Sequence, residues 1–352
     1  MQSPDRVLPA IQRVEDAFRS NPDTKWLLGF SGGKDSSALL RIVAHAARRL
    51  APDCPEVTIF YCDTGVESLV LDAYVKNLMT RLQDECRASN FLNFNLEVLR
   101  APINERFFVK IIGRGYPPPT TFFRWCTKSL RIRPVQRFLN SEDKAKKKIL
   151  MLGTRADESS QRSRVIQAFE DPFWQKPIET NGCDLIFAPI VDFNLSDVWD
   201  CLHALNLPES LDASDVVRLY EDAQGECPII RELNDKPCAA GRLGCWTCTV
   251  VRKDKSAENF VRAGHENLRP FLEFRNWLAE FRNDLEMRWP CRRNGRPGPG
   301  PFSLHARTVI LQRLQALEQK SGITILEEEE LVEIERLWAE DLSVEPKVMT
   351  SD

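Results

Sequence analysis

The sequence feature that most constrains the fold is a glycine-rich loop between an apolar strand and a helix. Residues 26–30 are mostly apolar, the loop reads Ser31-Gly32-Gly33-Lys34-Asp35-Ser36, and residues 37–50 carry apolar side chains at helical spacing. Glycines let backbone N–H groups close around phosphate oxygens, and the helix N-terminus adds a positive dipole end. The loop lacks the Gly-x-x-x-x-Gly-Lys-Ser/Thr pattern of a Walker loop. It therefore predicts phosphate binding of a different kind.

Strands and helices continue to alternate after this loop. Residues 57–62, 94–99 and 148–153 are expected to form strands, and residues 67–86 a helix. Such alternation is typical of an α/β fold with a doubly wound, mainly parallel sheet. In such folds, ligands bind at the loops that follow the carboxyl ends of the strands.

The chain changes character after about residue 251. Helical periodicity is expected over residues 270–288, 304–319 and 327–342, around a Gly/Pro/Arg-rich basic loop. We expect three parts: an α/β domain at 1–205, a cysteine-rich segment at 206–260, and a helical C-terminal region with a basic loop at 261–352.

Composition limits the partners and the location. The 48 Lys and Arg against 51 Asp and Glu give a formal charge of −3, without the basic excess of a stand-alone nucleic-acid binder. Any nucleic acid is therefore expected to meet a local basic patch or a partner protein. No apolar stretch approaches the roughly 18 residues of a membrane span. Residues 1–21 read as an amphipathic helix, not as a signal peptide. We expect a cytoplasmic protein that does not contact the membrane.

The eleven cysteines include a cluster at Cys238, Cys245 and Cys248. In a reducing compartment, clustered cysteines are more typical of metal binding than of disulfides. A fourth thiolate from Cys227 would give a zinc site, whereas Cys126 would give an iron–sulfur site. Spacing alone leaves both open.

Two further segments are candidates for phosphate contact. Three consecutive prolines precede Arg124 and Lys128 and exclude both helix and strand, so a rigid surface loop is expected there. The basic loop carries Arg288, Arg292, Arg293 and Arg296, and arginine binds phosphate bidentately. A solvated linker or a partner contact would explain the same composition.

The glycine loop resembles the pyrophosphate loop of the ATP pyrophosphatases, which include PAPS reductases, tRNA thiolases and GMP synthetase. The resemblance implies that the loop grips the β- and γ-phosphates of ATP with Mg²⁺, while AMP is transferred. Asp63-Thr64-Gly65 is similar to a nucleotide-side motif of that superfamily, and Gly153-Thr154-Arg155 through Arg162 is similar to a later Gly-x-Arg-x-x-Glu-Ser element. The implied ATP-binding residues are Phe30, Ser31, Gly32, Gly33, Lys34, Asp35, Ser36, Asp63, Thr64 and Gly153. The implied catalytic residues are Ser31, Asp35, Ser36, Arg124, Lys128, Arg155 and Arg162.

A narrower resemblance covers nearly the whole chain. Residues 113–128, 236–250, 272–277 and 298–301 are similar to DNA phosphorothioation proteins of the DndC and SspD type, which are commonly longer. The resemblance implies a 4Fe–4S cluster on Cys126, Cys238, Cys245 and Cys248, with zinc as the alternative. It also implies adenylylation of a DNA backbone phosphate before sulfur enters. The implied partners are DNA, a cysteine desulfurase as sulfur donor, and the ATPase and DNA-binding subunits of the modification system.

Three alternatives remain open. A PAPS reductase shares the loop but uses a cysteine in a C-terminal tail, and no cysteine follows Cys291 in this sequence. A tRNA thiolase shares both the loop and the chemistry. A non-catalytic assembly subunit would bind ATP and a cluster without turnover.

Overall fold

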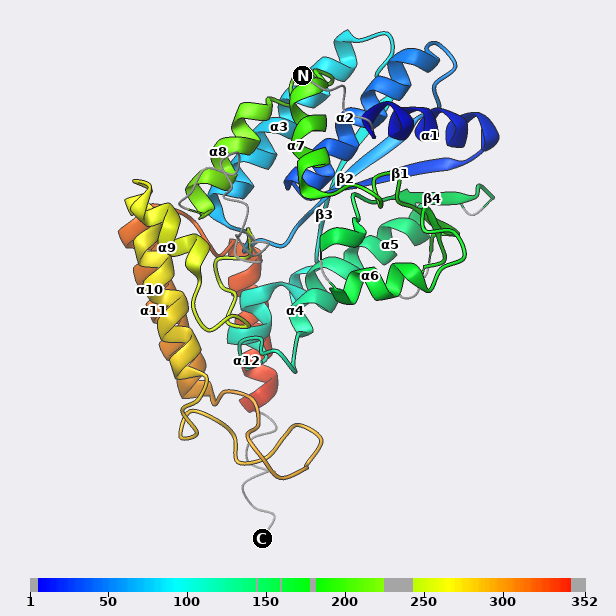
Figure 1. Ribbon diagram of the computed structural model, residues 1–352. Helices are drawn as coiled ribbons and strands as arrows, with labels where there is room; N and C mark the ends of the chain where they lie inside the picture. The colour runs from blue at the N-terminus through cyan, green and yellow to red at the C-terminus, as the bar shows by residue number, and fades with distance from the viewer. Residues whose placement is uncertain (1–5, 144, 159, 178–181, 225–242, 343–352) are drawn as a thin grey trace. The chain divides into compact units, whose positions relative to one another are not determined.

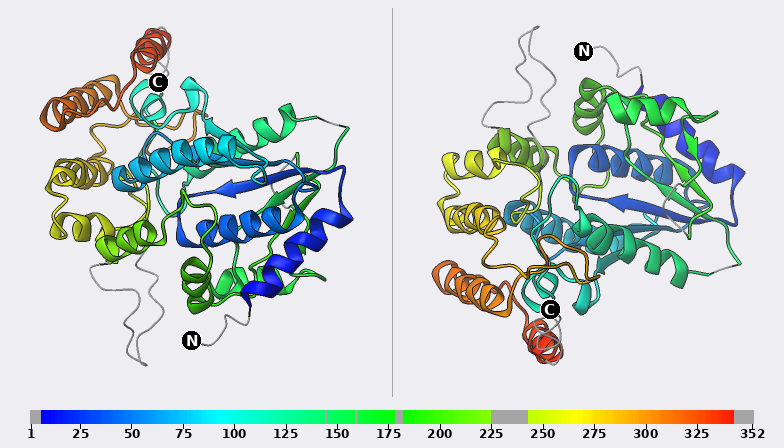
Figure 2. Two further views of the ribbon diagram at one scale, coloured as in Figure 1. Left: turned by 90° about the horizontal axis from the view of Figure 1, so that it is seen from above. Right: turned by 90° about the horizontal axis from the view of Figure 1, so that it is seen from below.

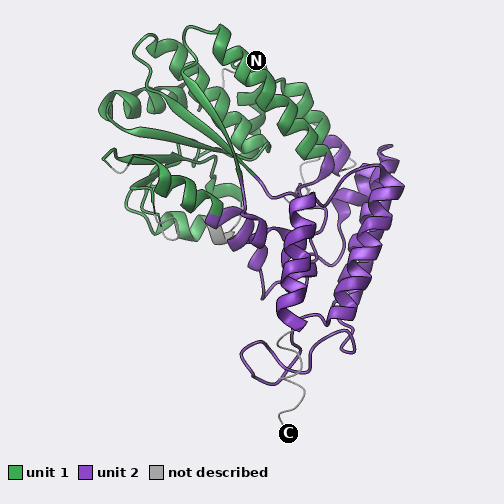
Figure 3. Cartoon of the chain, turned by 180° about the vertical axis from the view of Figure 1, so that it is seen from behind, with its two compact units in different colours: residues 1–62, 70–99, 134–220 green, residues 63–69, 100–133, 221–352 purple. Residues whose placement is uncertain are grey.

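The computed structural model describes residues 6–143, 145–158, 160–177, 182–224 and 243–342. These residues divide into two compact units. Unit 1 comprises residues 1–62, 70–99 and 134–220, and unit 2 comprises residues 63–69, 100–133 and 221–352 (Figure 3). The units are assembled from separate chain segments, so they do not correspond one to one with the expected consecutive parts. That functional division stays a prediction.

Unit 1 is built on a six-stranded sheet of order β3-β2-β1-β4-β6-β5 (Figure 1). Neighbouring strands β1/β2, β1/β4 and β4/β6 are parallel, and β5 runs antiparallel to β6. This confirms the expected α/β fold with a mainly parallel sheet. The strands are β1 (Lys25–Phe30), β2 (Val57–Asp63), β3 (Phe94–Arg100), β4 (Lys148–Met151), β5 (Trp174–Gln175) and β6 (Leu185–Phe187).

Alternation along β1 explains why the sheet is covered on both faces. Leu27 packs in a cluster with Leu139 of helix α5, whereas its neighbour Trp26 meets Phe18 of helix α1 with ring centroids 4.7 Å apart. Successive strand residues point to opposite faces, so buried neighbours require a layer on each side. Figure 2 shows the same helices from two further directions. The helices associated with this sheet are α1 (Val7–Ser20), α2 (Lys34–Leu50), α3 (Leu69–Ala88), α5 (Arg133–Ser141), α6 (Ser160–Gln167), α7 (Leu195–Ala204) and α8 (Ala213–Gln224).

Unit 2 is helical, and its core is rich in aromatic side chains. Phe108, Trp246 and Phe274 pack together there, with Trp246 5.7 Å from Phe108 and 5.9 Å from Phe274 between ring centroids. The helices of this unit are α4 (Trp125–Thr127), α9 (Lys255–Arg262), α10 (Arg269–Phe281), α11 (Leu304–Ser321) and α12 (Glu328–Leu342), together with a π-helical turn η2 (Val109–Gly113).

Helix α10 ends earlier than the expected residue 288. Its C-terminal end is followed by turns in which the Asp284 carboxylate accepts the Glu286 N–H at 3.0 Å. Short polar side chains of this kind compete with helical hydrogen bonds and favour turns. Within the described part of the chain, no helix combines the length and apolarity needed to cross a membrane.

Candidate active site

The glycine loop in unit 1 depends on the backbone freedom of Gly32. Gly32 has φ +73°, a left-handed conformation, and a Cβ atom there would lie 2.2 Å from Cγ2 of Val75. A side chain at this position is therefore excluded both by backbone strain and by space. Helix α2 begins at Lys34, so the loop leads directly into a helix N-terminus. The N–H groups of a first helical turn have no intrahelical acceptors and are suited to anions.

Two hydroxyl groups hold the loop closed. Ser36 Oγ donates to the Gly33 carbonyl at 2.9 Å and accepts the Ser31 N–H at 3.2 Å. The hydroxyls of Ser31 and Ser36 lie 3.1 Å apart. Ser36 is buried and fixes the loop, while Ser31 is exposed at the surface of the loop.

The segment after β4 packs against the same loop. A Cβ atom on Gly153 would lie 2.7 Å from the Asp35 carbonyl oxygen and 3.0 Å from the Ser36 nitrogen. Two residues later, Arg155 donates from Nε to the Asp35 carboxylate at 2.5 Å, and its side chain is 4% exposed. The structure therefore places Gly153 and Arg155 against the loop, and their roles toward ATP stay a prediction. Asp35 also pairs with Lys34 at 3.1 Å, which balances its charge on a second side.

Tyr220 completes this arrangement and was not found from the sequence. Its hydroxyl accepts the Lys34 N–H at 3.3 Å, and its ring lies 5.0 Å from the Lys34 ammonium. Burial raises the pKa of Tyr220, so the group stays a neutral phenol. No sequence signal near residue 220 indicates this contact, because it joins positions 186 residues apart.

Phe30 and Arg162, two further predicted site residues, have no described side-chain contact with the loop. Phe30 is the last residue of β1 and is buried, so its backbone rather than its side chain is available to a ligand. Arg162 lies in helix α6, and its side chain lies outside the described part of the structure.

The Asp63-Thr64-Gly65 motif follows β2 and belongs to unit 2. Asp63 accepts the Gly65 N–H at 2.8 Å, and Gly65 has φ +72°, so the motif is a tight turn. The turn lines a pocket together with Arg100 and Arg106, and Arg100 lies 3.3 Å from the Asp63 carboxylate. Both arginines also pair with Glu327, Arg100 at 2.7 Å and Arg106 at 2.6 Å, so the pocket is polar and carboxylates balance its positive charge.

A buried carboxylate, missed from the sequence, lies next to the cysteines in unit 2. Glu67 pairs with Arg131 at 2.7 Å, accepts the Thr64 hydroxyl at 3.1 Å, and accepts the Cys245 thiol at 3.7 Å. Burial raises the pKa of Glu67 despite these partners. Its position four residues after Asp63, at the end of a strand, was the available signal.

The predicted metal ligands come together only in part. Burial, followed by the charge of Glu67, raises the pKa of Cys245 to about 12, and Cys248 adds to the effect. Burial also raises the pKa of Cys126, again with a contribution from Cys248. Cys126 and Cys245 pack against the same core of unit 2. Cys238, the fourth predicted ligand, and Cys227, the zinc alternative, lie outside the described residues. The described residues by themselves contain no group of three or more side chains placed to hold a metal ion.

The proline segment differs from the expected surface loop. Pro118 and Pro119 are buried, and the Pro119 carbonyl is hydrogen-bonded. Thr249 Oγ1 donates to the Pro119 carbonyl at 2.7 Å, and Arg282 donates to the same oxygen at 2.9 Å. Proline lacks an N–H, so once its carbonyl is bonded the residue can be buried without an unpaired polar group. The exposed residues, including Arg124 and Lys128, follow after the prolines.

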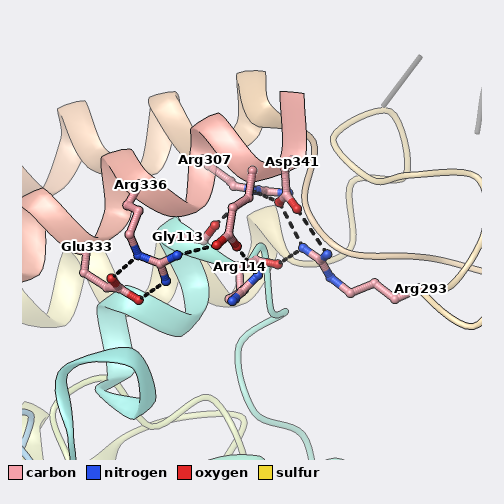
Figure 4. Close-up of polar contacts among 8 residues, drawn as sticks. Gly113, Arg114, Arg293, Arg307, Glu333, Arg336 and Asp341 are labelled. Carbon is pink, nitrogen blue, oxygen red and sulfur yellow. Dashed lines mark hydrogen bonds and ion pairs between the residues drawn. The ribbon is translucent and has the colours of Figure 1, made fainter. Parts of the chain in front are cut away.

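The basic loop uses part of its charge internally. Arg293 donates to both carboxylate oxygens of Asp341, which also binds the fully buried Arg307 at 2.6 Å (Figure 4). Arg288 donates to the Gly300 carbonyl from Nε at 2.6 Å. These arginines stabilise the loop, so their composition alone was a poor guide to phosphate contact.

Comparison with known proteins identifies a family. The phosphoadenosine phosphosulfate reductase domain matches residues 25–251 of this chain. Three solved structures resemble the chain at low similarity. The PAPS reductase of Candida auris in its phosphate complex is 13% identical with a TM-score of 0.35, covering 56% of this chain and 80% of that one. The NMN synthetase of Francisella tularensis is 13% identical with a TM-score of 0.39, covering 76% and 96%. The U34-tRNA thiolase NcsA of Methanococcus maripaludis, with its 4Fe–4S cluster, is 14% identical with a TM-score of 0.35, covering 67% and 89%. At this level of similarity, the comparison does not show whether these proteins and this chain share an activity.

Proposed function

Because this chain belongs to the phosphoadenosine phosphosulfate reductase domain family, we propose that it is an ATP pyrophosphatase that activates a nucleic-acid backbone phosphate for sulfur insertion. The observation that carries the proposal is the closed glycine loop at the N-terminus of α2. Its left-handed Gly32 and its paired Ser31 and Ser36 hydroxyls hold a backbone cradle for phosphate oxygens. The product that leaves from such a cradle is pyrophosphate.

The charged groups around the loop have complementary roles in this proposal. Lys34 and Arg155 supply positive charge close to the leaving pyrophosphate, where stabilising developing charge lowers the barrier. Magnesium binds mainly to substrate phosphates with one or two carboxylates, and Asp35 is the carboxylate of the loop. Because Asp35 already binds Arg155, that ion pair also fixes the orientation of the carboxylate.

The proposed reaction consists of an activation step and a sulfur-insertion step. A non-bridging oxygen of the acceptor phosphate attacks the α-phosphorus of ATP and releases pyrophosphate, leaving AMP joined to the acceptor phosphorus through oxygen. A sulfur nucleophile then attacks that phosphorus, a P–S bond forms, and AMP departs. A persulfide from a cysteine desulfurase can donate the sulfur if a second thiol then cleaves its S–S bond and is oxidised to a disulfide.

The family resemblance extends the proposal to DNA phosphorothioation, with Cys126, Cys238, Cys245 and Cys248 as cluster ligands. Cys126 and Cys245 pack against the same core of unit 2, and the Cys248 N–H donates to the Cys245 carbonyl at 2.9 Å, which supports part of the proposed ligand set. When bound, such a cluster would supply structural cross-linking or electron and sulfur relay. The DNA, the desulfurase and the other modification subunits remain proposed partners. A tRNA acceptor is the alternative for the same chemistry.

Pyrophosphate release is the direct test of this function. We would measure it with wild-type protein, ATP and Mg²⁺, with and without single-stranded DNA, duplex DNA and tRNA. Ser36→Ala removes the hydroxyl that ties Ser31 to Gly33 and should lower the rate about 100-fold. Ser196→Ala is the matched control, since Ser196 makes one long contact of 3.5 Å to Asp200 on α7. Nucleotide binding without pyrophosphate release under any condition would favour the assembly-subunit alternative.

The acceptor is identified separately in cells. Mass spectrometry of nuclease-digested DNA and tRNA would compare strains that carry the intact gene with its neighbours or the Cys245→Ser variant. Phosphorothioate-linked dinucleotides that depend on Cys245 would support the DNA acceptor. Thionucleosides in tRNA together with unmodified DNA would move the acceptor to RNA.

A further inference from the structure

One aromatic side chain of unit 2 is almost fully exposed and does not contribute to the packing of that unit. Phe122 is 99% exposed, the largest exposure among the large apolar residues that the structure describes. It lies in a tight turn whose ends bond to each other: the Thr120 N–H donates to the Phe123 carbonyl at 3.3 Å, and the Phe123 N–H donates to the Thr120 carbonyl at 3.2 Å. Phe122 therefore occupies a central turn position.

The amino-acid type at that position is not explained by the turn. Central turn positions favour Gly, Pro, Asn and Asp, because these residues suit the backbone angles or bond to it. A phenylalanine there buries no surface and contributes no apolar stabilisation in this unit. The neighbouring aromatic residues behave differently: Phe123 stacks on Tyr116 with an interplanar angle of 16°, and Trp125 packs on Phe107 at 5.4 Å. Phe122 is the most exposed residue of this group, ahead of Phe123 at 44%.

The turn is presented by a rigid support. The Trp125 indole N–H donates to the Pro117 carbonyl at 2.9 Å, and Thr249 and Arg282 hold the Pro119 carbonyl. Three successive prolines have fixed φ angles, which reduces the conformations available to the segment. An aromatic ring held in this way loses little entropy when it meets a ligand.

Cationic side chains lie close to the turn in the sequence. Arg124 and Lys128 follow it, and both are exposed without an ion pair to any residue in the described ranges. The basic loop is tied to the same segment, because the Phe302 N–H donates to the Gly115 carbonyl at 2.7 Å and Arg293 donates to the Arg114 carbonyl at 2.8 Å (Figure 4). That loop exposes two further arginines, Arg292 and Arg296.

An exposed ring among cations is complementary to single-stranded nucleic acid. A nucleobase offers a flat π-face for stacking, and its flanking phosphates pair with arginine and lysine. We propose that Phe122 is a stacking platform for one unpaired nucleobase, with Arg124 and Lys128 on the adjacent phosphates. This inference rests on the proposed function for taking nucleic acid as the acceptor. It adds that the acceptor is bound unpaired at this position.

Fluorescence anisotropy with the full-length protein tests the inference. The probes are a DNA single strand and an RNA single strand, each roughly 12 nucleotides long, and a DNA duplex of the same sequence. Phe122→Ala should weaken single-strand binding roughly 5- to 150-fold, which corresponds to the ~1–3 kcal/mol of one stacked base. Phe122→Trp should restore it. Comparing the DNA and RNA strands identifies the source of the unpaired base.

Matched variants separate stacking from other causes. Val332→Ala removes another exposed apolar side chain of unit 2, 62% exposed on α12, and should leave single-strand affinity unchanged. Phe122→Leu keeps an apolar side chain without a π-face and should bind like Phe122→Ala. Arg124→Gln removes one phosphate contact and should reduce the salt slope of binding by about 0.7. Melting temperatures of the Phe122 variants should match wild type, because the ring is exposed.

Single-strand binding tests the stacking inference, and pyrophosphate release tests the proposed function. Wild-type protein that releases pyrophosphate but binds no single strand, or binds it equally well with Phe122→Ala, overturns the stacking inference alone. Full single-strand binding by Phe122→Leu also refutes stacking, because an apolar side chain without a π-face would then be sufficient. Single-strand binding that depends on Phe122, without pyrophosphate release, leaves the stacking inference standing and removes the proposed activity.

Discussion

Gly153→Ala is the substitution that most directly tests how the phosphate loop is held. The added Cβ atom would meet the Asp35 carbonyl oxygen at 2.7 Å, the Asp35 carbonyl carbon at 2.9 Å and the Ser36 nitrogen at 3.0 Å. All three are backbone atoms, so no side chain can rotate away. The loop or the segment after β4 has to retreat by roughly 0.7 Å to reach ordinary van der Waals contact near 3.4 Å.

Two effects of different size follow from this displacement. Overpacking of a well-packed region costs about 1–3 kcal/mol of stability, which the fold should tolerate. A displacement approaching 1 Å in groups that position a reacting phosphate can cost about 100-fold in rate, so we expect a loss of about ten- to 100-fold in pyrophosphate release. Activity should therefore fall much further than stability.

Single-turnover pyrophosphate release, ATP affinity by calorimetry and thermal unfolding should be measured together on this variant. Gly322→Ala is the control, because Gly322 has φ +69° with nothing within 4 Å of its Cβ position, and it ends helix α11 in the other unit. Its strain costs about 1–2 kcal/mol without moving the phosphate loop, so release should be unchanged. Wild-type ATP affinity and release rate in Gly153→Ala would refute the idea that close backbone approach defines the loop.

Three further predictions concern charge. Arg155→Met leaves Asp35 without its buried partner, so thermal unfolding should show a loss of about 3 kcal/mol, together with weakened ATP binding. Asp341→Asn removes the buried anion of the cluster in Figure 4 and should cost about 3 kcal/mol in urea unfolding, whereas Glu333→Gln, in a more exposed pair, should leave the midpoint nearly unchanged. Burial and neighbouring arginines lower the pKa of His45 to about 4. Between about pH 6.5 and pH 4, His45 is protonated in the unfolded chain and neutral in the folded protein. The free energy of unfolding should therefore fall as pH drops through that range. His45→Gln should flatten that part of the stability profile, and an unchanged profile would contradict this assignment.

The sequence was sufficient where the determining interactions are local. The strand, the glycine loop and the helix after it are encoded by side-chain periodicity and by the need for a left-handed residue at Gly32, which lies within the same short segment. The parallel sheet followed from the alternation of strands and helices, because parallel strands require such crossovers. Family resemblance added Gly153 and Arg155, and the structure places both against the loop.

Long-range packing determines which distant residues share a site and which charges are available to a ligand. Tyr220 reaches Lys34 across 186 positions, and Glu67 reaches Cys245 across 178, with no periodic pattern to indicate either contact. Composition treated the arginines of the basic loop alike, yet Arg293 is bound to Asp341. The same holds for exposure, since nothing in the residue type separates the exposed Phe122 from the buried Trp125 three positions later. These features depend on long-range packing, in which each side chain's surroundings are set by segments far away in the chain.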